Sequence, residues 1–302
     1  MGSVLRAKSM YDRITIAIDG SDEAKYAAKR GLELALTLNA TVDALYVVPQ
    51  KSLQLTQTTE EQTRLRDRGE AFLSEIEELA SEIDYPIVTA LSEGKPAVQI
   101  SKHASDQNTN LIIIGRQGIT GLGKRFLGGV SEQVLYQSDV PVFVIPDTDQ
   151  ITEYCRILIP TDGSGNAEVA APFGATIAQF YDSEIHVLNV VDIQAAGGVF
   201  NAGGLEKEFI ERLEARGQKA VKRTVTGIDD TTPNANVQTN IKRMTSFEGV
   251  AAGIREYAEG NDIDLIVMGS HGRSNLRRQL LGNVASTILR TVDVPVLIVK
   301  RT

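Results

Sequence analysis

The chain has 302 residues, of which 42% are hydrophobic and 23% charged, and its formal net charge at pH 7 is −8. This length predicts two domains of about 150 residues each, and the composition is ordinary for a globular protein. The acidic balance argues against nucleic acid as the main partner, because domains that bind nucleic acid are usually basic.

Cys155 is the only cysteine, so the sequence holds no disulfide framework and no zinc-ligand spacing. A reducing compartment is therefore expected. The apolar runs are shorter than the roughly 20 residues that span a bilayer, and the first residues lack the apolar stretch of a signal peptide. We expect a cytoplasmic protein without a membrane partner.

Apolar runs and helical periodicity alternate through the first half of the chain. The expected strands are residues 13–18, 41–48, 86–91, 111–114 and 140–145, with helices from Ser21, over 60–83, from Pro96 and up to Gln137. Residues 49–59 are polar and are expected to form an irregular loop. Such alternation predicts a parallel sheet with helices on both faces, and strands that are apolar throughout suit a sheet covered on both sides.

The same order restarts after a polar linker at residues 147–153. The expected strands are now 156–160, 184–191, 237–243, 265–268 and 294–299, and the expected helices include 205–226 and 247–259. Pro172 falls inside the first helix, where proline costs about 3 kcal/mol, so a kink is expected there. A glycine-rich loop at 195–204 has no close counterpart in the first half.

Corresponding residues in the two halves indicate an internal duplication. Asp19 matches Asp162, Gly115 matches Gly269, and Pro141 matches Pro295. We predict two tandem α/β domains, residues 10–146 and 154–301, each long enough for its own core. Each is expected to be a Rossmann-like or flavodoxin-like open parallel sheet of five strands, with 2-1-3-4-5 or its variant 3-2-1-4-5 as possible orders, of which we predict 3-2-1-4-5.

A repeated glycine frame is the strongest functional signal. It lies between an expected strand and an expected helix in each half, with the same spacing, at Gly115, Gly118 and Gly128 and again at Gly269, Gly272 and Gly282. Glycine lets the backbone approach a ligand closely, and a helix N-terminus favours an anion, most often phosphate. Nearby basic residues would add to the positive field: Lys124, Arg125, Arg277 and Arg278. The alternative is a pair of flexible loops with solvated basic side chains.

Open parallel sheets bind ligands outside the carboxyl ends of their strands, beside the first strand in this order. Asp19 and Asp162 follow the first strand of each half. An aspartate there could accept from a base amino group or a ribose hydroxyl, and the glycine loop could donate to phosphates, which together suit a nucleotide. The alternative is an Asp-Gly turn that caps the following helix, and the two roles can coexist.

Several motifs together carry a family resemblance. They are Asp-Gly-Ser after the first strand, Val47-Val48 and Val190-Val191 ending the second, the glycine frame, and Val-Pro-Val in the last strand. The chain resembles a universal stress protein with two such domains in tandem, over residues 10–146 and 154–301. Nucleotide-binding members of that family resemble one another in Gly-x2-Gly-x9-Gly-Ser/Thr, and their aspartate contacts adenine.

The resemblance implies binding of ATP or a related adenine nucleotide, with which magnesium could arrive. The implied nucleotide-binding residues of the first half are Asp19, Val47, Gly115, Gly118, Gly128, Gly129, Val130 and Ser131. Those of the second half are Pro160, Thr161, Asp162, Val190, Met268, Gly269, Gly272, Gly282, Asn283 and Val284.

Both halves depart from the motif at the Ser/Thr position, which holds Gly129 in the first half and Asn283 in the second. A lost hydroxyl bond to a charged group is worth about 1.5–3 kcal/mol, which weakens binding rather than abolishing it. The second half is the favoured site, because its Pro160-Thr161-Asp162 and Met268-Gly269 are closer to the family's binding pattern.

No catalytic constellation is visible, and we expect no turnover enzyme. His186 is expected to be a packed strand residue, His103 a solvated helix residue, His271 a loop residue that could touch phosphate, and Cys155 a small apolar filler. No serine or cysteine has a visible base partner, and no carboxylate cluster suggests a metal cage.

Three function classes remain from the sequence. The first is a nucleotide-binding stress-response module with regulatory conformations, the second a protein-interaction module that binds no nucleotide, and the third, weaker, a phosphotransfer or hydrolytic enzyme. Valine-rich edge strands favour pairing, and in this family such edges pair between domains. An intrachain pseudo-dimer and a homodimer of tandem chains are therefore expected.

Overall fold

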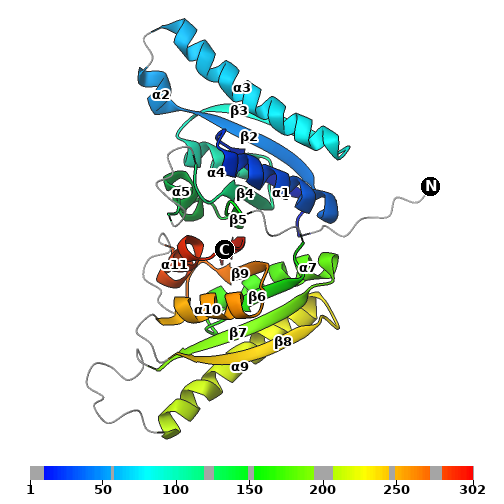
Figure 1. Cartoon of the computed structure of the whole chain (residues 1–302), viewed down its shortest axis with the longest axis vertical. Helices are drawn as coiled ribbons and strands as arrows, with labels where there is room; N and C mark the ends of the chain where they lie inside the picture. Colours follow the sequence, from blue (N-terminus) through cyan, green and yellow to red (C-terminus); the bar gives the residue numbers. More distant parts are fainter. Residues whose placement is uncertain are drawn as a thin grey trace, which may run out of the picture. The chain divides into compact units, whose positions relative to one another are not determined.

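A computed structural model describes residues 10–55, 58–118, 126–148, 153–193, 207–244, 249–272 and 281–301 of the chain. The chain divides into two compact units, Met1–Asp147 and Thr148–Thr302. Each unit is an α/β sandwich with one parallel sheet (Figure 1).

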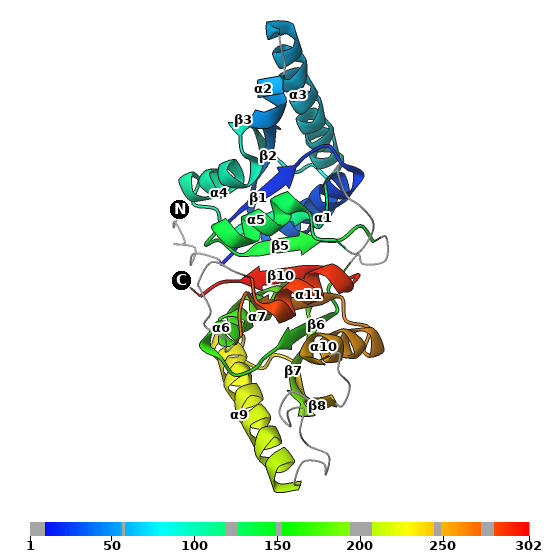
Figure 2. The same cartoon turned by 90° about the vertical axis from the view of Figure 1, so that its left-hand side faces the viewer.

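The first unit carries its strands in the order β3-β2-β1-β4-β5, all parallel where pairing is described. The helices α1 and α3 pack on one face of the sheet, and α4 and α5 pack on the other (Figure 2). Its elements are β1 (Arg13–Ile18), α1 (Asp22–Leu38), β2 (Thr41–Pro49), α2 (Gln50–Leu55), α3 (Thr59–Glu82), β3 (Ile87–Gly94), α4 (Pro96–Asp106), β4 (Leu111–Gly115), α5 (Gly129–Gln137) and β5 (Val142–Ile145).

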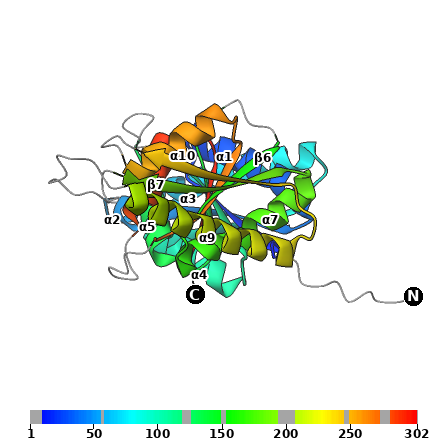
Figure 3. The same ribbon diagram turned by 90° about the horizontal axis from the view of Figure 1, so that it is seen from below.

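The second unit repeats this order as β8-β7-β6-β9-β10. Figure 3 shows α9 and α10 on opposite sides of β7. Its elements are β6 (Arg156–Pro160), α6 (Gly165–Glu168), α7 (Ala170–Tyr181), β7 (Glu184–Asp192), α9 (Lys207–Thr231), β8 (Val237–Met244), α10 (Gly249–Gly260), β9 (Leu265–Gly269), α11 (Asn283–Thr291) and β10 (Val296–Val299). The predicted strand order 3-2-1-4-5 is confirmed in each unit.

Buried strands form the core of each unit. Every residue of β4 and β9 is buried, as are all but the first residue of β1 and β6. This agrees with the continuous apolar runs, since a parallel sheet covered on both faces leaves no polar side. The outermost strands β3 and β8 are partly exposed, and they carry more polar side chains.

Local signals explain where the first helices begin and end. Ser21 and Ser164 are N-caps whose hydroxyls accept from Ala24 N–H at 3.1 Å and Ala167 N–H at 3.2 Å. At the other end, Asn39 and Asp182 have left-handed backbones, each with φ of 53°. The two units therefore use serine N-caps and left-handed C-caps at corresponding positions.

Pro172 does accompany a break, but the break lies upstream of it. The predicted helix is divided at Val169 into α6 and α7, and Pro172 lies in the first turn of α7. A proline there removes no intrahelical hydrogen bond, because the first N–H groups of a helix have no partner within it.

Two other local predictions were wrong. Residues 49–59, expected as an irregular loop, contain the short helix α2. Cys155, expected as an apolar filler, is exposed. Within the described part of the chain, no helix is both long and apolar enough to cross a membrane.

Candidate functional site

An Asp-Gly-Ser turn follows the first strand of each unit. Asp19 Oδ1 accepts from Ser21 N–H at 3.0 Å and from its hydroxyl at 2.6 Å, and Asp162 Oδ1 accepts from Ser164 N–H at 2.9 Å. Gly20 and Gly163 have φ of 82° and 75°, which favours glycine. One carboxylate oxygen thus builds the turn, and the helix cap itself is the serine.

The other carboxylate oxygen of each aspartate faces the second glycine of the frame. A Cβ on Gly118 would lie 2.1 Å from Asp19 Oδ2, and a Cβ on Gly272 would lie 2.6 Å from Asp162 Oδ2. Real Cβ atoms do not come that close to an oxygen. The structure therefore brings together, in both units, the aspartate and the glycine loop that the sequence predicted as one site.

The third glycine of each frame starts the helix after the loop. Gly128 and Gly282 are the N-caps of α5 and α11, and their N–H groups donate at 2.8 Å to Arg116 C=O and Ser270 C=O. The next N–H groups lie in the first turn, where they have no partner within the helix. Two nine-residue helices thus point their positive dipole ends at the aspartate-bearing edge of the sheet.

The residues of that first turn differ between the units. Gly129 is exposed and has open space where a side chain would stand, whereas its counterpart Asn283 is exposed and carries an amide. Val130 is exposed and Val284 is half-buried. Ser131, predicted on the phosphate side, is buried and its hydroxyl donates to Gly115 C=O at 2.8 Å, so it ties the helix start to the end of β4.

The remaining predicted site residues lie on the second strands. Val47 lies near the carboxyl end of β2 and is 7% exposed, and Val190 takes the same place in β7 and is half-buried. In the first unit, β2 leads into α2, which borders a surface hollow of about 490 Å³ lined by Gln50, Leu53, Glu93, Gly94, Lys95, Val98 and Gln99. Gln50, Glu93 and Gly94 place this hollow at the carboxyl ends of β2 and β3, and Val47 is not among its lining residues.

A sequence profile of the universal stress protein family matches residues 10–146 and 153–300. The chain belongs to the universal stress protein family. Universal stress protein MJ0531 of Methanocaldococcus jannaschii is 36% identical over 149 residues, which cover 49% of this chain and 83% of that protein. YxiE of Bacillus subtilis is 29% identical over 147 residues, covering 45% of this chain and 99% of that protein.

A solved universal stress protein from Archaeoglobus fulgidus matches almost the whole chain. Its TM-score is 0.70 at 21% identity, and the match covers 97% of this chain and 98% of that one. This likeness concerns the fold, which is that of a universal stress protein with two domains.

The turn after the first strand is more polar in the second universal stress protein domain. Thr161 Oγ1 accepts from Gly163 N–H at 3.2 Å and from the Thr224 hydroxyl at 3.0 Å, and Thr161 C=O accepts from Asn189 Nδ2 at 2.7 Å. In the first domain Ile18, Tyr46 and Ile76 take the places of Thr161, Asn189 and Thr224. Nearby, the rings of Tyr46 and Phe72 pack 5.8 Å apart. Pro160 is the buried last residue of β6, and Met268 is a buried residue near the end of the neighbouring strand β9.

A carboxylate distinguishes the first domain. Glu23 Oε1 accepts from Gln117 N–H at 3.0 Å, inside the glycine frame. Burial raises the pKa of Glu23, although the Gln117 N–H and the Arg116 charge act in the opposite direction. The corresponding residue of the second domain is Asn166, whose backbone oxygen would lie 2.1 Å from a Cβ on Gly269. The motifs of the sequence did not include Glu23, and its difference from Asn166 was the available signal.

His271 lies inside the second glycine loop, as predicted. Its Nδ1 is 2.9 Å from the Ser270 hydroxyl, and its Nε2 is buried and has no hydrogen-bond partner among the described residues. Burial lowers the pKa of His271, and the charge of Lys300 lowers it further. Both effects favour the neutral form of the imidazole.

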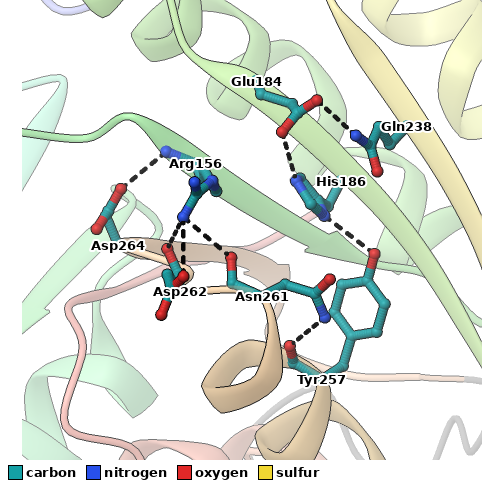
Figure 4. Close-up of polar contacts among 8 residues, drawn as sticks. All are labelled: Arg156, Glu184, His186, Gln238, Tyr257, Asn261, Asp262 and Asp264. Atoms are coloured by element: carbon teal, nitrogen blue, oxygen red, sulfur yellow. Dashed lines mark hydrogen bonds and ion pairs between the residues drawn. The ribbon is translucent and has the colours of Figure 1, made fainter.

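The other histidines lie at the amino ends of the strands, away from this site. Figure 4 shows His186 between Glu184 and Tyr257, with Nε2···Oε2 of 3.1 Å and Nδ1···Oη of 3.0 Å. His186 is 3% exposed, so the prediction of a packed residue is confirmed. His103, predicted to be solvated, is mostly buried and lies 3.6 Å from the buried carboxylate of Asp43, so that prediction was wrong.

Some predicted features fall outside the described residues. They are the basic residues Lys124, Arg125, Arg277 and Arg278 and the loop at 195–204. Among the residues that are described, no three His, Cys, Asp or Glu side chains gather closely enough to hold a metal ion.

Proposed function

We propose that this universal stress protein binds an adenine nucleotide at the carboxyl ends of its strands, with the second domain as the preferred site, and that occupancy regulates its interactions. The contact of Gly118 with Asp19, repeated by Gly272 and Asp162, carries the proposal. A side chain at either glycine would fill the space beside the carboxylate. Glycine there leaves room beside the carboxylate for a ligand atom.

The residues present fit a nucleotide by their chemistry. Asp162 would accept from the base or the ribose, and the first-turn N–H groups of α11 with the Asn283 amide would donate to phosphates. A bound nucleotide supplies negative charge at the loop, with which Mg²⁺ would arrive. Asp19 and α5 offer the same elements in the first domain.

Three differences favour the second domain. It has a neutral Asn166 where the first domain has the Glu23 carboxylate, which would repel phosphate and already accepts a loop N–H. It has a side-chain donor at Asn283, where Gly129 has none. It also has His271, which can take up a proton beside an anion.

The test begins with protein purified without added ligand, denatured so that any released nucleotide is identified by mass spectrometry. Titration calorimetry with ATP, AMP and cyclic AMP then compares Asp162→Ala with Asp19→Ala. We expect close to one nucleotide per chain and at least about a tenfold loss of affinity for Asp162→Ala alone. Equal losses would mean two equivalent sites, and no binding by the wild type would overturn the proposal.

The alternative is an interaction module that binds no nucleotide, in which the glycine loops are structural. It would be supported if neither thermal stability nor calorimetry responded to adenine nucleotides at millimolar concentration. We propose no turnover: the Ser270 hydroxyl lies 2.9 Å from His271 Nδ1, but Ser270 is only 3% exposed. Release of more than a few equivalents of ADP per chain would reject the proposal that the protein does not hydrolyse ATP with turnover.

A further inference from the structure

The long helices α3 and α9 are held to their own domains by ion pairs at matching places. Each helix makes one pair with the helix after the first strand and one with the outermost strand. The pairs are Lys25–Glu75 and Arg66–Glu93 in the first domain, and Glu168–Arg223 and Glu214–Arg243 in the second.

Two glycines establish that the places correspond. Gly69 of α3 lies against Tyr46, the sixth residue of β2, and Gly217 of α9 lies against Asn189, the sixth residue of β7. Arg66 and Glu214 each precede their glycine by three residues. The two helices therefore pack on their sheets in the same register.

The remaining partners are equivalent by the same reasoning. Glu75 and Arg223 each follow the glycine by six residues. Glu93 and Arg243 are the seventh residues of β3 and β8. Finally, Lys25 and Glu168 each follow their serine N-cap by four residues. All four residues of each domain therefore have a counterpart in the other.

The polarity of both pairs is reversed between the domains. In the first domain the helix supplies Arg66 and Glu75, and in the second it supplies Glu214 and Arg223. The Arg66–Glu93 and Arg223–Glu168 contacts are both 2.5 Å. Arg223 also donates to Gly163 C=O at 2.6 Å, so this pair reaches the turn beside Asp162.

An exchange of helices would turn every attraction into a repulsion. If α9 packed on the first sheet, Glu214 would meet Glu93. Arg223 would then meet Lys25. If α3 packed on the second sheet, Arg66 would meet Arg243. Glu75 would then meet Glu168.

We infer that these reversed ion pairs direct each long helix to its own domain. A chain with two copies of one fold is exposed to misassembly, in which an element packs on the wrong copy within a chain or between chains. One exposed ion pair contributes little to stability. Here two contacts per helix change sign together, and the difference between matched and mismatched packing is what specificity requires.

The decisive variant gives the first domain the polarity of the second while keeping every pair. It is Lys25→Glu, Glu75→Arg, Arg66→Glu and Glu93→Arg in the full chain. Its urea midpoint is expected to stay close to that of the wild type, because each pair is restored. After refolding by dilution from urea, the fraction of misassembled protein on size exclusion should rise at least about threefold, since the helices no longer differ in charge.

The second variant reverses the helix alone, with Arg66→Glu and Glu75→Arg. It should lower the urea midpoint because like charges now face each other, which shows that the pairs form in solution. The matched control is Lys242→Glu with Glu256→Lys, an ion pair whose counterparts in the first domain are Ser92 and Lys102. This control should refold like the wild type.

Salt provides an independent arm. At about 1 M salt the Debye length falls to about 3 Å, so misassembly of the wild type should rise toward that of the four-substitution variant. The inference is overturned if that variant refolds as cleanly as the wild type, or if the control reversal raises misassembly equally. It is also overturned if the helix-only variant keeps the wild-type midpoint.

Discussion

The two universal stress protein domains share a backbone frame at the carboxyl ends of their strands but fill it with different polar groups. Both place a glycine against an aspartate and a helix N-terminus beyond it. The first domain adds the Glu23 carboxylate, and the second adds Thr161 and His271. Duplication thus kept the geometry of the proposed nucleotide site, while the charge around it diverged.

The amino ends of the strands diverged as well. Asp43, the third residue of β2, binds Arg13 through two hydrogen bonds of 2.7 and 2.8 Å. The third residue of β7 is His186, which contacts Glu184 and Tyr257 instead. One buried polar position has therefore kept a satisfied network in each domain with different chemistry, as burial of a polar group requires.

The largest expected effect on ATP affinity comes from substituting the glycine that faces the aspartate, which should affect one domain and not the other. Gly272→Ala should reduce ATP affinity by about 100-fold, because a Cβ 2.6 Å from Asp162 Oδ2 displaces the carboxylate. Gly118→Ala should leave the affinity of the preferred site unchanged. Calorimetry measures both.

The control is Gly260→Ala, where a Cβ would meet nothing within 4 Å. It should bind ATP like the wild type, and all three variants should keep the wild-type circular dichroism. Equal affinity for Gly272→Ala and the wild type would remove the second domain from consideration as the site.

Most of the fold followed from the sequence because it depends on patterns that repeat. Apolar runs located the strands, Ser21 and Ser164 located the first helices, and the duplication confirmed each assignment with a second copy. Local composition gave the wrong prediction at α2. There a polar stretch after Pro49 forms a helix that packs on β2, β3 and α3. Tertiary packing outweighed local composition there.

Of the site, the sequence predicted the residues of the glycine frame and the aspartate beside it, but not the polar groups that reach them from other elements. The approach of Gly118 to Asp19 follows from strand order, since both lie at the carboxyl ends of neighbouring strands. The bond from Gln117 N–H to Glu23 joins residues 94 apart in sequence, and no local pattern announces it. His103 was misjudged for the same reason, because Asp43 reaches it from another element.

A smaller effect should come from exchanging the residues that distinguish the two loops. Glu23→Gln keeps an acceptor for Gln117 N–H but removes the charge, so ATP affinity of the first domain should rise about tenfold. The reciprocal Asn166→Glu should weaken the second domain by a similar factor. Calorimetric stoichiometry distinguishes one site from two.

The pKa of Glu23 provides a stability control for the Glu23→Gln variant. Because burial raises that pKa, the native state holds the proton more tightly than the unfolded state does. The contribution of Glu23 to the free energy of unfolding therefore declines as pH rises from the unfolded-state pKa through the native pKa. Glu23→Gln should therefore not lower the urea midpoint at pH 7. A lower midpoint together with unchanged ATP affinity would assign Glu23 a structural role alone.

A hydroxyl at Gly129 should have a more modest effect. The open space there admits Gly129→Ser without a clash, and a donor at a helix N-terminus strengthens phosphate binding by about threefold to tenfold. The gain should be larger in the Glu23→Gln background, where the opposing carboxylate charge is gone. Val130→Ser, at the exposed neighbouring position, controls for polarity, and an equal gain from it would discount the position of the hydroxyl.

The smallest effect concerns pH and His271. Burial lowers its pKa, so in the ligand-free protein the unfolded state takes up the proton first and stability falls as pH drops below about 6.5. A phosphate beside the imidazole favours the protonated form, so ATP affinity should rise about threefold between pH 8 and pH 6. His271→Asn should flatten both trends relative to the wild type, in urea midpoints and in calorimetry. If stability flattens while the pH dependence of affinity remains, His271 is buried in the loop but does not reach the phosphate, and the preference for the second domain then depends on Asn166 and Asn283.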